Sequence, residues 1–286
     1  MLDFKRKLDE LIAIYTLEEE LLDIYVEGPT DRFIFENFCE YKELDKSIIE
    51  IDTIDLSETQ ELFPDLNLKS NKDKLIALSR ILEQNKIKSK ITCIIDRDFD
   101  GILFPLEEND FLTYTDFSCA ESYIFCKKHI EKLTKVGLKN FPHKTDIIIS
   151  EVSKVLLGLF ILRMINKKFD LNFKFPKIEN NMPTNKVTGI CDFNFQQYLD
   201  IYINTNKLIN QKTEILDFVK LITTQLNSDY RFNMNGHDFI EVLFNYVNKI
   251  KNTPNFKLDN FENALMLSVQ PNYLEDYELF KLIGKA

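Results

Sequence analysis

The sequence predicts an α/β protein, in which a core with a short parallel sheet flanked by helices precedes a mostly helical C-terminal region. Up to about residue 115, short apolar runs alternate with amphipathic helical patterns, which indicates repeated strand–helix–strand units. From about residue 128 the patterns are nearly all helical. We therefore expect two domains, a core over residues 1–127 and a helical domain over residues 128–286.

The expected core alternates four strands with three helices. Strands are expected at residues 21–26, 48–51, 91–95 and 111–115, and helices at residues 3–15, 30–40 and 71–82. The polar segment 55–70 is expected to be a loop. Ile91–Ile95 is continuously apolar and rich in β-branched residues, which is typical of a central parallel strand.

The expected C-terminal domain consists of helices of unequal length. They are predicted at residues 129–138, 146–166, within 196–225, at 237–250 and at 258–268. Residues 170–195 contain two prolines and alternating phenylalanines, and are expected to form a loop or short edge strands. No repeat of fixed period and no sustained heptad pattern occurs, so we expect neither a solenoid nor a coiled coil.

Composition limits the class of protein. The chain has 286 residues, and its 44% apolar content with 24 phenylalanines is sufficient for a substantial core. No apolar run reaches the length of a membrane span and the N-terminus does not resemble a signal peptide, so we expect a cytoplasmic protein with no membrane contact. The five cysteines lack a CxxC spacing, which favours reduced core thiols over structural zinc.

The acidic charge lies in the first half of the chain. The net charge of −10 arises within residues 1–150, whereas residues 151–286 are close to neutral. Most of this excess is expected to be a solvated surface, and a fraction fits carboxylates that hold a divalent cation. An acidic chain binds nucleic acid poorly without a local basic strip, because Lys and Arg supply most of the affinity.

Two carboxylates stand at the ends of predicted parallel strands. Glu27 follows the first strand and precedes a Gly28-Pro29 turn, and Asp96 follows the strand at 91–95. Because the carboxyl ends of parallel strands share one edge, we expect both side chains there. Asp98 joins them if the Asp96-Arg97-Asp98 segment is extended. Converging carboxylates repel one another unless a cation neutralises them, and oxygen ligands favour one or two Mg²⁺ or Mn²⁺ ions.

These residues resemble the motifs of the TOPRIM domain, a Rossmann-like metal-binding module of topoisomerases, primases and nucleases. The resemblance covers Val26-Glu27-Gly28-Pro29-Thr30-Asp31 and Ile94-Ile95-Asp96-Arg97-Asp98. It implies that Glu27 acts as general acid or base, or positions a metal, and that Asp96 and Asp98 hold Mg²⁺. Asp31 matches a further acidic ligand of the OLD-type nucleases.

A further match to the OLD-type branch follows the fourth strand. That branch carries Glu-Asn-Tyr at the start of a helix, and this chain has Glu121-Ser122-Tyr123. The resemblance implies that Glu121 contributes to a second metal position, although the asparagine is missing. The alternative is that Glu121 is an exposed helical residue.

Gly236-His237-Asp238 is the candidate site in the C-terminal half. Gly236 precedes a helical run, so the simple interpretation is a helix start in which Asp238 favours the helix dipole. The functional interpretation, by resemblance to a late Gly-Lys of OLD-type nucleases, is that His237 contacts the scissile phosphate. His129 and His143 have no such context and are expected to be structural or exposed.

As a whole, the chain resembles the TOPRIM effector nucleases of the PARIS anti-phage defence system. The resemblance implies a toxic effector that is held inactive by an ABC-type ATPase partner and, once released, forms a homodimer and cleaves nucleic acid, expected to be transfer RNA. The C-terminal domain is then expected to serve dimerisation and partner contacts and to return Gly236-His237-Asp238 to the site.

The reaction expected from these residues is metal-dependent hydrolysis of a phosphodiester. Glu27 accepts a proton or tethers a metal, and Arg97 or His237 stabilises developing charge. Arg97 is alternatively one partner of a structural ion pair.

The alternatives to an RNA-cleaving effector are a DNA endonuclease of the OLD type and a non-catalytic regulatory TOPRIM subunit. The chain is too short for a topoisomerase, and it lacks the zinc module expected of a primase.

Overall fold

The computed structural model describes residues 5–139, 141–251 and 257–285 and divides into two compact units. The sheet unit comprises Met1–Arg97, Leu106–Asp116 and Gln270–Ala286. The helical unit comprises Asp98–Pro105 and Phe117–Val269. The chain therefore leaves the sheet unit directly after Arg97, between two of the candidate carboxylates. The expected division into a core over residues 1–127 and a helical domain over residues 128–286 stays a prediction.

A parallel four-stranded sheet forms the centre of the sheet unit, which confirms the α/β prediction. Its strands are β2 (Ile24–Val26), β3 (Ile48–Glu50), β5 (Thr92–Ile95) and β6 (Leu112–Tyr114). Their order is β3-β2-β5-β6, with Ile24 of β2 aligned to Ile48 of β3 and to Thr92 of β5. A separate parallel pair joins β1 (Arg6–Lys7) to β4 (Ile54–Asp55). The central positions of β2 and β5 agree with their uniformly apolar sequences.

The direction of chain progression reverses at β2. The chain moves from β2 to β3 on one side, and then crosses back over β2 to β5 on the other. Right-handed crossovers in opposite directions place their helices on opposite faces of the sheet. Ligands of open α/β sheets bind at the carboxyl ends of the strands that flank such a reversal. In this sheet those strands are β2 and β5.

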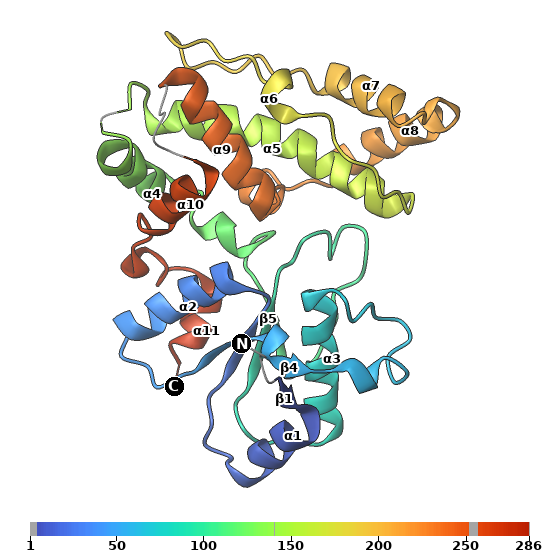
Figure 1. Ribbon diagram of the computed structural model, residues 1–286, viewed down its shortest axis with the longest axis vertical. Coiled ribbons are helices and arrows are strands. Elements are labelled where there is room, and N and C mark those ends of the chain that lie inside the picture. The colour runs from blue at the N-terminus through green and yellow to red at the C-terminus, as the bar shows by residue number, and fades with distance from the viewer. Residues whose placement is uncertain (1–4, 140, 252–256, 286) are drawn as a thin grey trace. The chain divides into compact units, whose positions relative to one another are not determined.

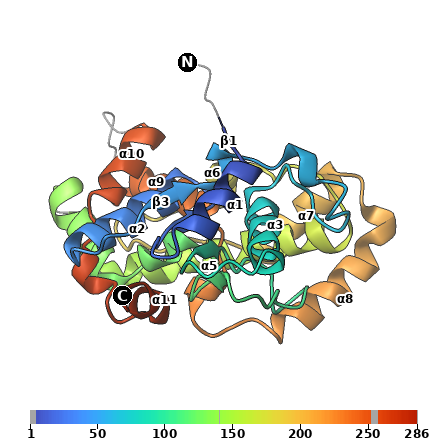
Figure 2. The same cartoon turned by 90° about the horizontal axis from the view of Figure 1, so that it is seen from below.

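Helices cover both faces of the sheet, as the crossovers require. They are α1 (Leu8–Leu17), α2 (Pro29–Tyr41), α3 (Asn71–Gln84) and α11 (Glu278–Ile283). In both views α2 and α3 lie on opposite sides of the sheet (Figures 1 and 2). Leu11 of α1 and Leu78 of α3 share one buried apolar cluster, whereas Phe280 of α11 stacks on Phe35 of α2 at 5.4 Å between ring centroids.

A buried polar network joins helix α1 to β2 and to Asp23, which directly precedes the strand. The Tyr15 hydroxyl donates to Asp23 Oδ2 at 2.6 Å and lies 2.6 Å from the Tyr25 hydroxyl, which must therefore be the donor in that second bond. Both tyrosines are fully buried. Burial raises the pKa of both hydroxyls well above the usual range, so they remain neutral donors.

The helical unit contains the remaining helices. These are α4 (Lys127–Lys132), α5 (Thr145–Lys168), α6 (Ile178–Asn181), α7 (Phe195–Thr205), α8 (Lys212–Thr223), α9 (Gly236–Ile250) and α10 (Leu258–Met266). Most of these elements confirm the helical periodicity of the sequence. The predicted helix at 129–138 instead changes to a π-helical turn at Leu133–Gly137, and the 170–195 segment contains the single turn α6 and one bridge between Thr184 and Cys191.

The long helix α5 forms the core of the helical unit. It is buried along most of its length, and α9 packs against it (Figure 1). Gly158 allows the segment before α7 to approach α5 closely, because a Cβ atom there would lie 2.7 Å from the Phe193 ring. Within this core, Arg163 of α5 forms a bidentate ion pair with the buried Asp238 of α9, at 2.5 and 2.7 Å. The two helices are therefore joined by both apolar packing and a charged pair.

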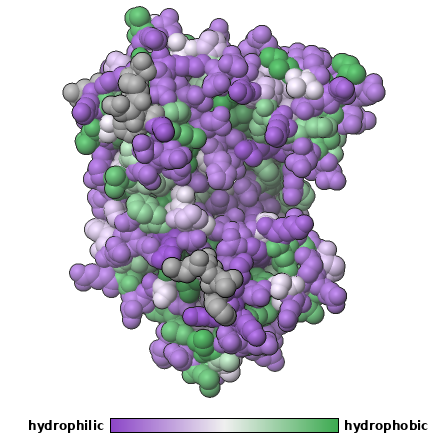
Figure 3. Space-filling model, in the orientation of Figure 1, coloured by the Kyte–Doolittle hydropathy of each residue, from purple (hydrophilic) through white to green (hydrophobic). Residues whose placement is uncertain are grey.

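The surface is largely hydrophilic on the face shown in Figure 3, with apolar residues scattered over it. Exposed apolar side chains include Leu17, Val136 and Val187, which are far apart in the sequence. In the part of the chain that the structure describes, no helix combines the length and the apolar character needed to span a bilayer. All five cysteines are free, and all except Cys126 are buried.

We expect Tyr15→Phe to lower the free energy of unfolding by about 1–3 kcal/mol, because it leaves the buried Asp23 carboxylate without its hydroxyl donor. Urea denaturation measures this loss. Tyr41→Phe is the matched control, since Tyr41 is 48% exposed, and should change stability by less than about 0.5 kcal/mol. Equal effects of the two variants would contradict a structural role for the buried network.

Candidate functional site

The two central strands of the sheet unit bring two of the predicted carboxylate residues together. Glu27 follows β2, Asp96 follows β5, and Glu27 Oε1 accepts a hydrogen bond from the Asp96 backbone N–H at 3.0 Å. The Glu27 carbonyl also accepts from Asn71 Nδ2 at 2.8 Å, which ties the strand end to the start of α3. The structure therefore places the Glu27 carboxylate beside the Asp96 backbone at one sheet edge, whereas the predicted convergence of the two side chains stays a prediction.

The turn after Glu27 starts helix α2. Gly28 is extended, with φ −161°, and Pro29 is the first residue of the helix, where the missing N–H has no cost. Asp31 Oδ2 accepts from the Gly28 N–H at 3.1 Å. Asp31 thus caps the N-terminus of the helix that the sequence predicted at residues 30–40. Its predicted role as a metal ligand stays a prediction.

Arg97 lies at the same end of β5. Its backbone N–H donates to Thr115 Oγ1 at 3.2 Å, and its guanidinium lies 5.6 Å from the centroid of the Tyr114 ring. The buried Arg97 Nε has no hydrogen-bond partner among the residues that the structure describes. The arrangement therefore favours an aromatic contact over the predicted structural ion pair.

Sequence reasoning missed Asn71 and Lys72, in the first turn of α3. Asn71 holds the Glu27 carbonyl, and Lys72 Nζ lies 3.5 Å from the Arg97 carbonyl oxygen. The sequence contained a signal for these two residues, because a crossover helix of a parallel sheet starts beside the edge where the strands end. Lys72 places a cationic side chain at the carboxyl end of β5.

Asp98 begins the helical unit and does not continue the strand. The sequence analysis expected Asp98 to join Asp96 if the segment between them were extended. Asp98 instead adopts a left-handed backbone conformation, with φ +45°. Aspartate tolerates this region better than most residues. The Asp98 N–H donates to the Ser118 carbonyl at 2.8 Å, which ties this turn to the helical unit.

Glu121 lies against the N-terminus of α9 in the helical unit. It belongs to the 3₁₀ turn Ala120–Tyr123 and is only 8% exposed, so the alternative of an exposed helical residue is wrong. A Cβ atom on Gly236 would lie 2.0 Å from Glu121 Oε2, a separation that atoms do not tolerate. Burial raises the pKa of Glu121, and the charge of His237 opposes this shift.

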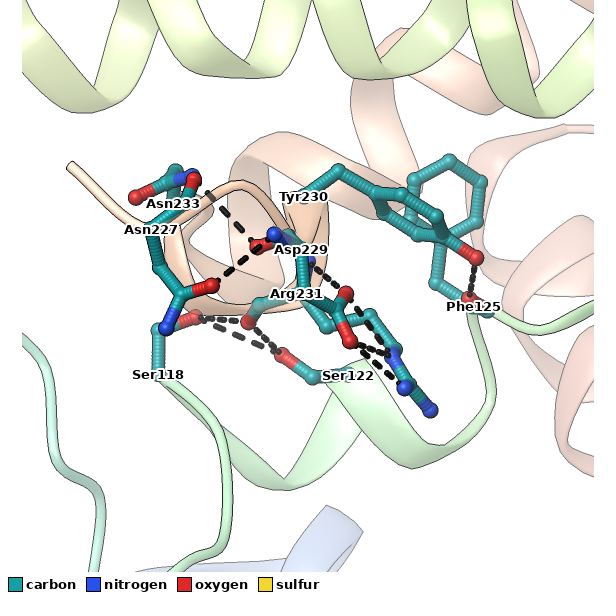
Figure 4. A network of polar contacts seen from close by, with 8 residues as sticks. All are labelled: Ser118, Ser122, Phe125, Asn227, Asp229, Tyr230, Arg231 and Asn233. Atoms are coloured by element: carbon teal, nitrogen blue, oxygen red, sulfur yellow. Dashed lines mark hydrogen bonds and ion pairs between the residues drawn. The ribbon is translucent and has the colours of Figure 1, made fainter.

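Figure 4 shows the polar network that holds this arrangement. The Arg231 carbonyl accepts from Ser118 Oγ at 2.8 Å and from Ser122 Oγ at 3.0 Å. The Arg231 guanidinium pairs with Asp229 at 2.6 Å. Tyr230 donates to the Phe125 carbonyl at 2.9 Å. The segment before α9 is thus fastened to the Glu121 turn on both sides.

The three histidines have distinct surroundings. His237 is exposed at the start of α9, next to the buried Asp238, whose carboxylate binds Arg163. His129 is buried with Nδ1 3.2 Å from the Tyr123 carbonyl oxygen, and His143 Nε2 lies 3.0 Å from the Lys186 carbonyl oxygen. These contacts agree with the expected structural roles of His129 and His143.

Among the described residues, no three or more His, Cys, Asp or Glu side chains form a cluster suited to a metal ion. The chemistry of the candidate donors in the sheet unit still fits Mg²⁺ or Mn²⁺, because Glu27, Asp31 and Asp96 offer carboxylate oxygens only. No protein-family model matches the chain, and a search of curated proteins finds no significant match.

We expect Gly236→Ala to destabilise helix α9 by about 1–3 kcal/mol, because its methyl group overlaps the buried Glu121 carboxylate. Hydrogen–deuterium exchange of the α9 amides measures the loss. Gly28→Ala is the matched control, since a Cβ there meets no atom within 4 Å, and it should leave α9 exchange unchanged. Unchanged α9 exchange in Gly236→Ala would contradict the close approach.

We also expect Glu121→Gln to weaken the pH dependence of stability. Because burial raises the folded pKa of Glu121, this group favours folding below the unfolded value of about 4.3 and loses that contribution as the pH rises through the folded pKa. Urea denaturation between about pH 5 and about pH 8 should therefore show a smaller decline for the variant than for the wild type. Glu108→Gln, at an exposed position, should retain the wild-type slope. A variant curve parallel to the wild type would exclude Glu121 as its source.

Proposed function

We propose that this protein is a Mg²⁺-dependent nuclease of the TOPRIM type that cleaves phosphodiester bonds. The observation that carries the proposal is the hydrogen bond between the Glu27 carboxylate and the Asp96 N–H, at the reversal between β2 and β5. It joins the two motifs on which the TOPRIM resemblance rests. The parallel sheet with helices on both faces supports the same assignment at the level of fold.

In the proposed site, Glu27 and Asp96 hold the metal with help from Asp31, and the resemblance adds Asp98 and Glu121 as further ligands. When bound, Mg²⁺ supplies polarisation of the phosphate and a water of lowered pKa. Glu27 accepts the proton of the attacking water, for which its carboxylate must lie within hydrogen-bond reach. Arg97 and His237 are the proposed stabilisers of developing negative charge.

The resemblance to PARIS effectors adds a cellular role to the proposed activity. We propose a toxic effector of anti-phage defence that cleaves RNA, with transfer RNA as the expected substrate. An ABC-type ATPase partner holds it inactive, and homodimerisation accompanies activity. These proposals rest on the sequence motifs, and a DNA endonuclease with the same site is the competing outcome of the test below.

Glu27→Ala should reduce Mg²⁺-dependent cleavage at least about 100-fold, because it removes the proposed proton acceptor and a metal ligand. The measurement incubates the purified full chain with transfer RNA, single-stranded RNA and plasmid DNA, in Mg²⁺ and in EDTA. Glu36→Ala is the matched control, since Glu36 is a half-exposed carboxylate on α2 that pairs with Arg32, and it should cleave at the wild-type rate.

Sequencing of cellular RNA ends after expression of the chain extends the same test. Transfer RNA fragments that vanish in Glu27→Ala support the RNA effector, whereas cut plasmid DNA beside intact RNA supports the DNA endonuclease. Cleavage that persists in EDTA or in Glu27→Ala, or a wild type that cuts neither RNA nor DNA even with its partner, would overturn the nuclease proposal.

A further inference from the structure

The helical unit contains a cavity of about 310 Å³ that none of the roles above explains. The end of α5, the Asp98-Phe99 turn and the segment between α5 and α6 line it, together with Asn235 at the start of α9. Its volume lies at the lower end of the range for sites that bind small organic groups. Asp98, which the resemblance assigns to the metal site, lies in its wall.

One wall of the cavity combines a fixed cation with an aromatic ring. Arg163 is held by its bidentate pair with Asp238, and its guanidinium lies 5.5 Å from the centroid of the Phe175 ring. Tyr202 packs edge-on to the same ring at 6.0 Å. Because both groups are held by packing and ion pairing, they are ordered before any ligand arrives.

A second cation and aromatic pair lies at the same cavity. Phe99 lines the cavity and packs on Phe160 at 5.1 Å between ring centroids. Lys167 is exposed on α5 and lies 5.5 Å from the centroid of the Phe104 ring. The cavity therefore offers two aromatic side chains, a fixed guanidinium and an exposed ammonium group at its rim.

The charges of the cavity exclude a simple phosphate site. Asp98 and Asp170 also line it, and the charge of Arg163 is already matched by Asp238. Free phosphate would therefore meet nearly balanced charge. A nucleotide within a strand is different, because its base gains from aromatic contact while its phosphate needs only the cation at the rim.

We propose that this cavity binds an unpaired nucleotide of the substrate strand. The base packs on Phe175 and Phe99, and the adjacent phosphate contacts Lys167. A paired base has its faces covered by its neighbours, so the cavity selects single-stranded or looped segments over a continuous duplex. This inference rests on the proposed nuclease function, because the strand that supplies the nucleotide is the proposed substrate.

The test measures binding without cleavage, in Glu27→Gln, which retains an oxygen acceptor for the Asp96 N–H. Fluorescence anisotropy follows a labelled strand of about 12 nucleotides, as RNA and as DNA, each alone and annealed to its complement. We expect the single strands to bind at least about tenfold more tightly than their duplexes. Single strands that bind no more tightly than duplexes would overturn the proposal.

Matched variants locate the contact on the protein. Lys167→Ala should weaken binding and reduce the slope of log affinity against log salt by about 0.7, the value for one phosphate contact to a single strand. Lys168→Ala is its control, because Lys168 is the exposed neighbour on α5 and does not line the cavity. Equal slopes for the two variants would overturn the assignment of Lys167.

Phe175→Ala should weaken single-strand binding about tenfold through loss of stacking. Phe173→Ala, at a ring that is 38% exposed and outside the cavity, should retain wild-type affinity. Since Phe175 also packs on Tyr202, circular dichroism checks its folding, and the exposed Lys167 variant decides the question if Phe175→Ala unfolds.

Failure of this inference is distinguishable from failure of the nuclease proposal. Mg²⁺-dependent cleavage that depends on Glu27, with duplex bound as well as single strand, overturns the nucleotide cavity alone. Single-strand binding that depends on Lys167, with no cleavage of any substrate, supports the cavity and overturns the nuclease.

Discussion

The parallel pairing of β2 with β5 is the constraint on which the sheet unit depends. Aligning Ile24 with Thr92 brings the carboxyl ends of two buried strands side by side, and Glu27 then bonds to the Asp96 N–H. Both strands are central and largely buried, so the packing of the sheet holds their carboxyl ends beside each other. The position of the candidate site is thus a consequence of packing the sheet.

A second constraint orders the helical unit. The buried Glu121 carboxylate occupies the space that a side chain at 236 would need, so glycine is required where α9 begins. Serine hydroxyls on the Arg231 carbonyl hold the preceding segment, and the Arg163–Asp238 pair joins α9 to α5. Breaking a buried pair of this kind leaves a charge without compensation, which is strongly destabilising. Several contacts therefore hold the start of α9, and Asn235 beside it lines the cavity.

Local sequence patterns predicted the helices and strands well where burial of a regular apolar pattern decides the structure. The apolar run at 91–95 became the central strand β5, and the helical periodicity at 146–166 became α5. The predictions were less successful where tertiary contacts decide. Asp98 turns into a left-handed conformation instead of extending the strand, and Glu121 is buried although its sequence context also allowed exposure. Neither outcome has a local signal, because each depends on segments that meet only in the fold.

The sequence by itself determined the alternation of strands and helices, and it placed Glu27 and Asp96 after buried strands. These follow from apolar periodicity and from turn residues, which act over a few neighbouring positions. Only the tertiary structure decided that Lys72 lies near the Arg97 carbonyl, that Gly236 makes room for Glu121, and that Arg163 and Phe175 share a cavity wall. These contacts join residues distant in the chain, and packing and charge pairing select them once the helices have met.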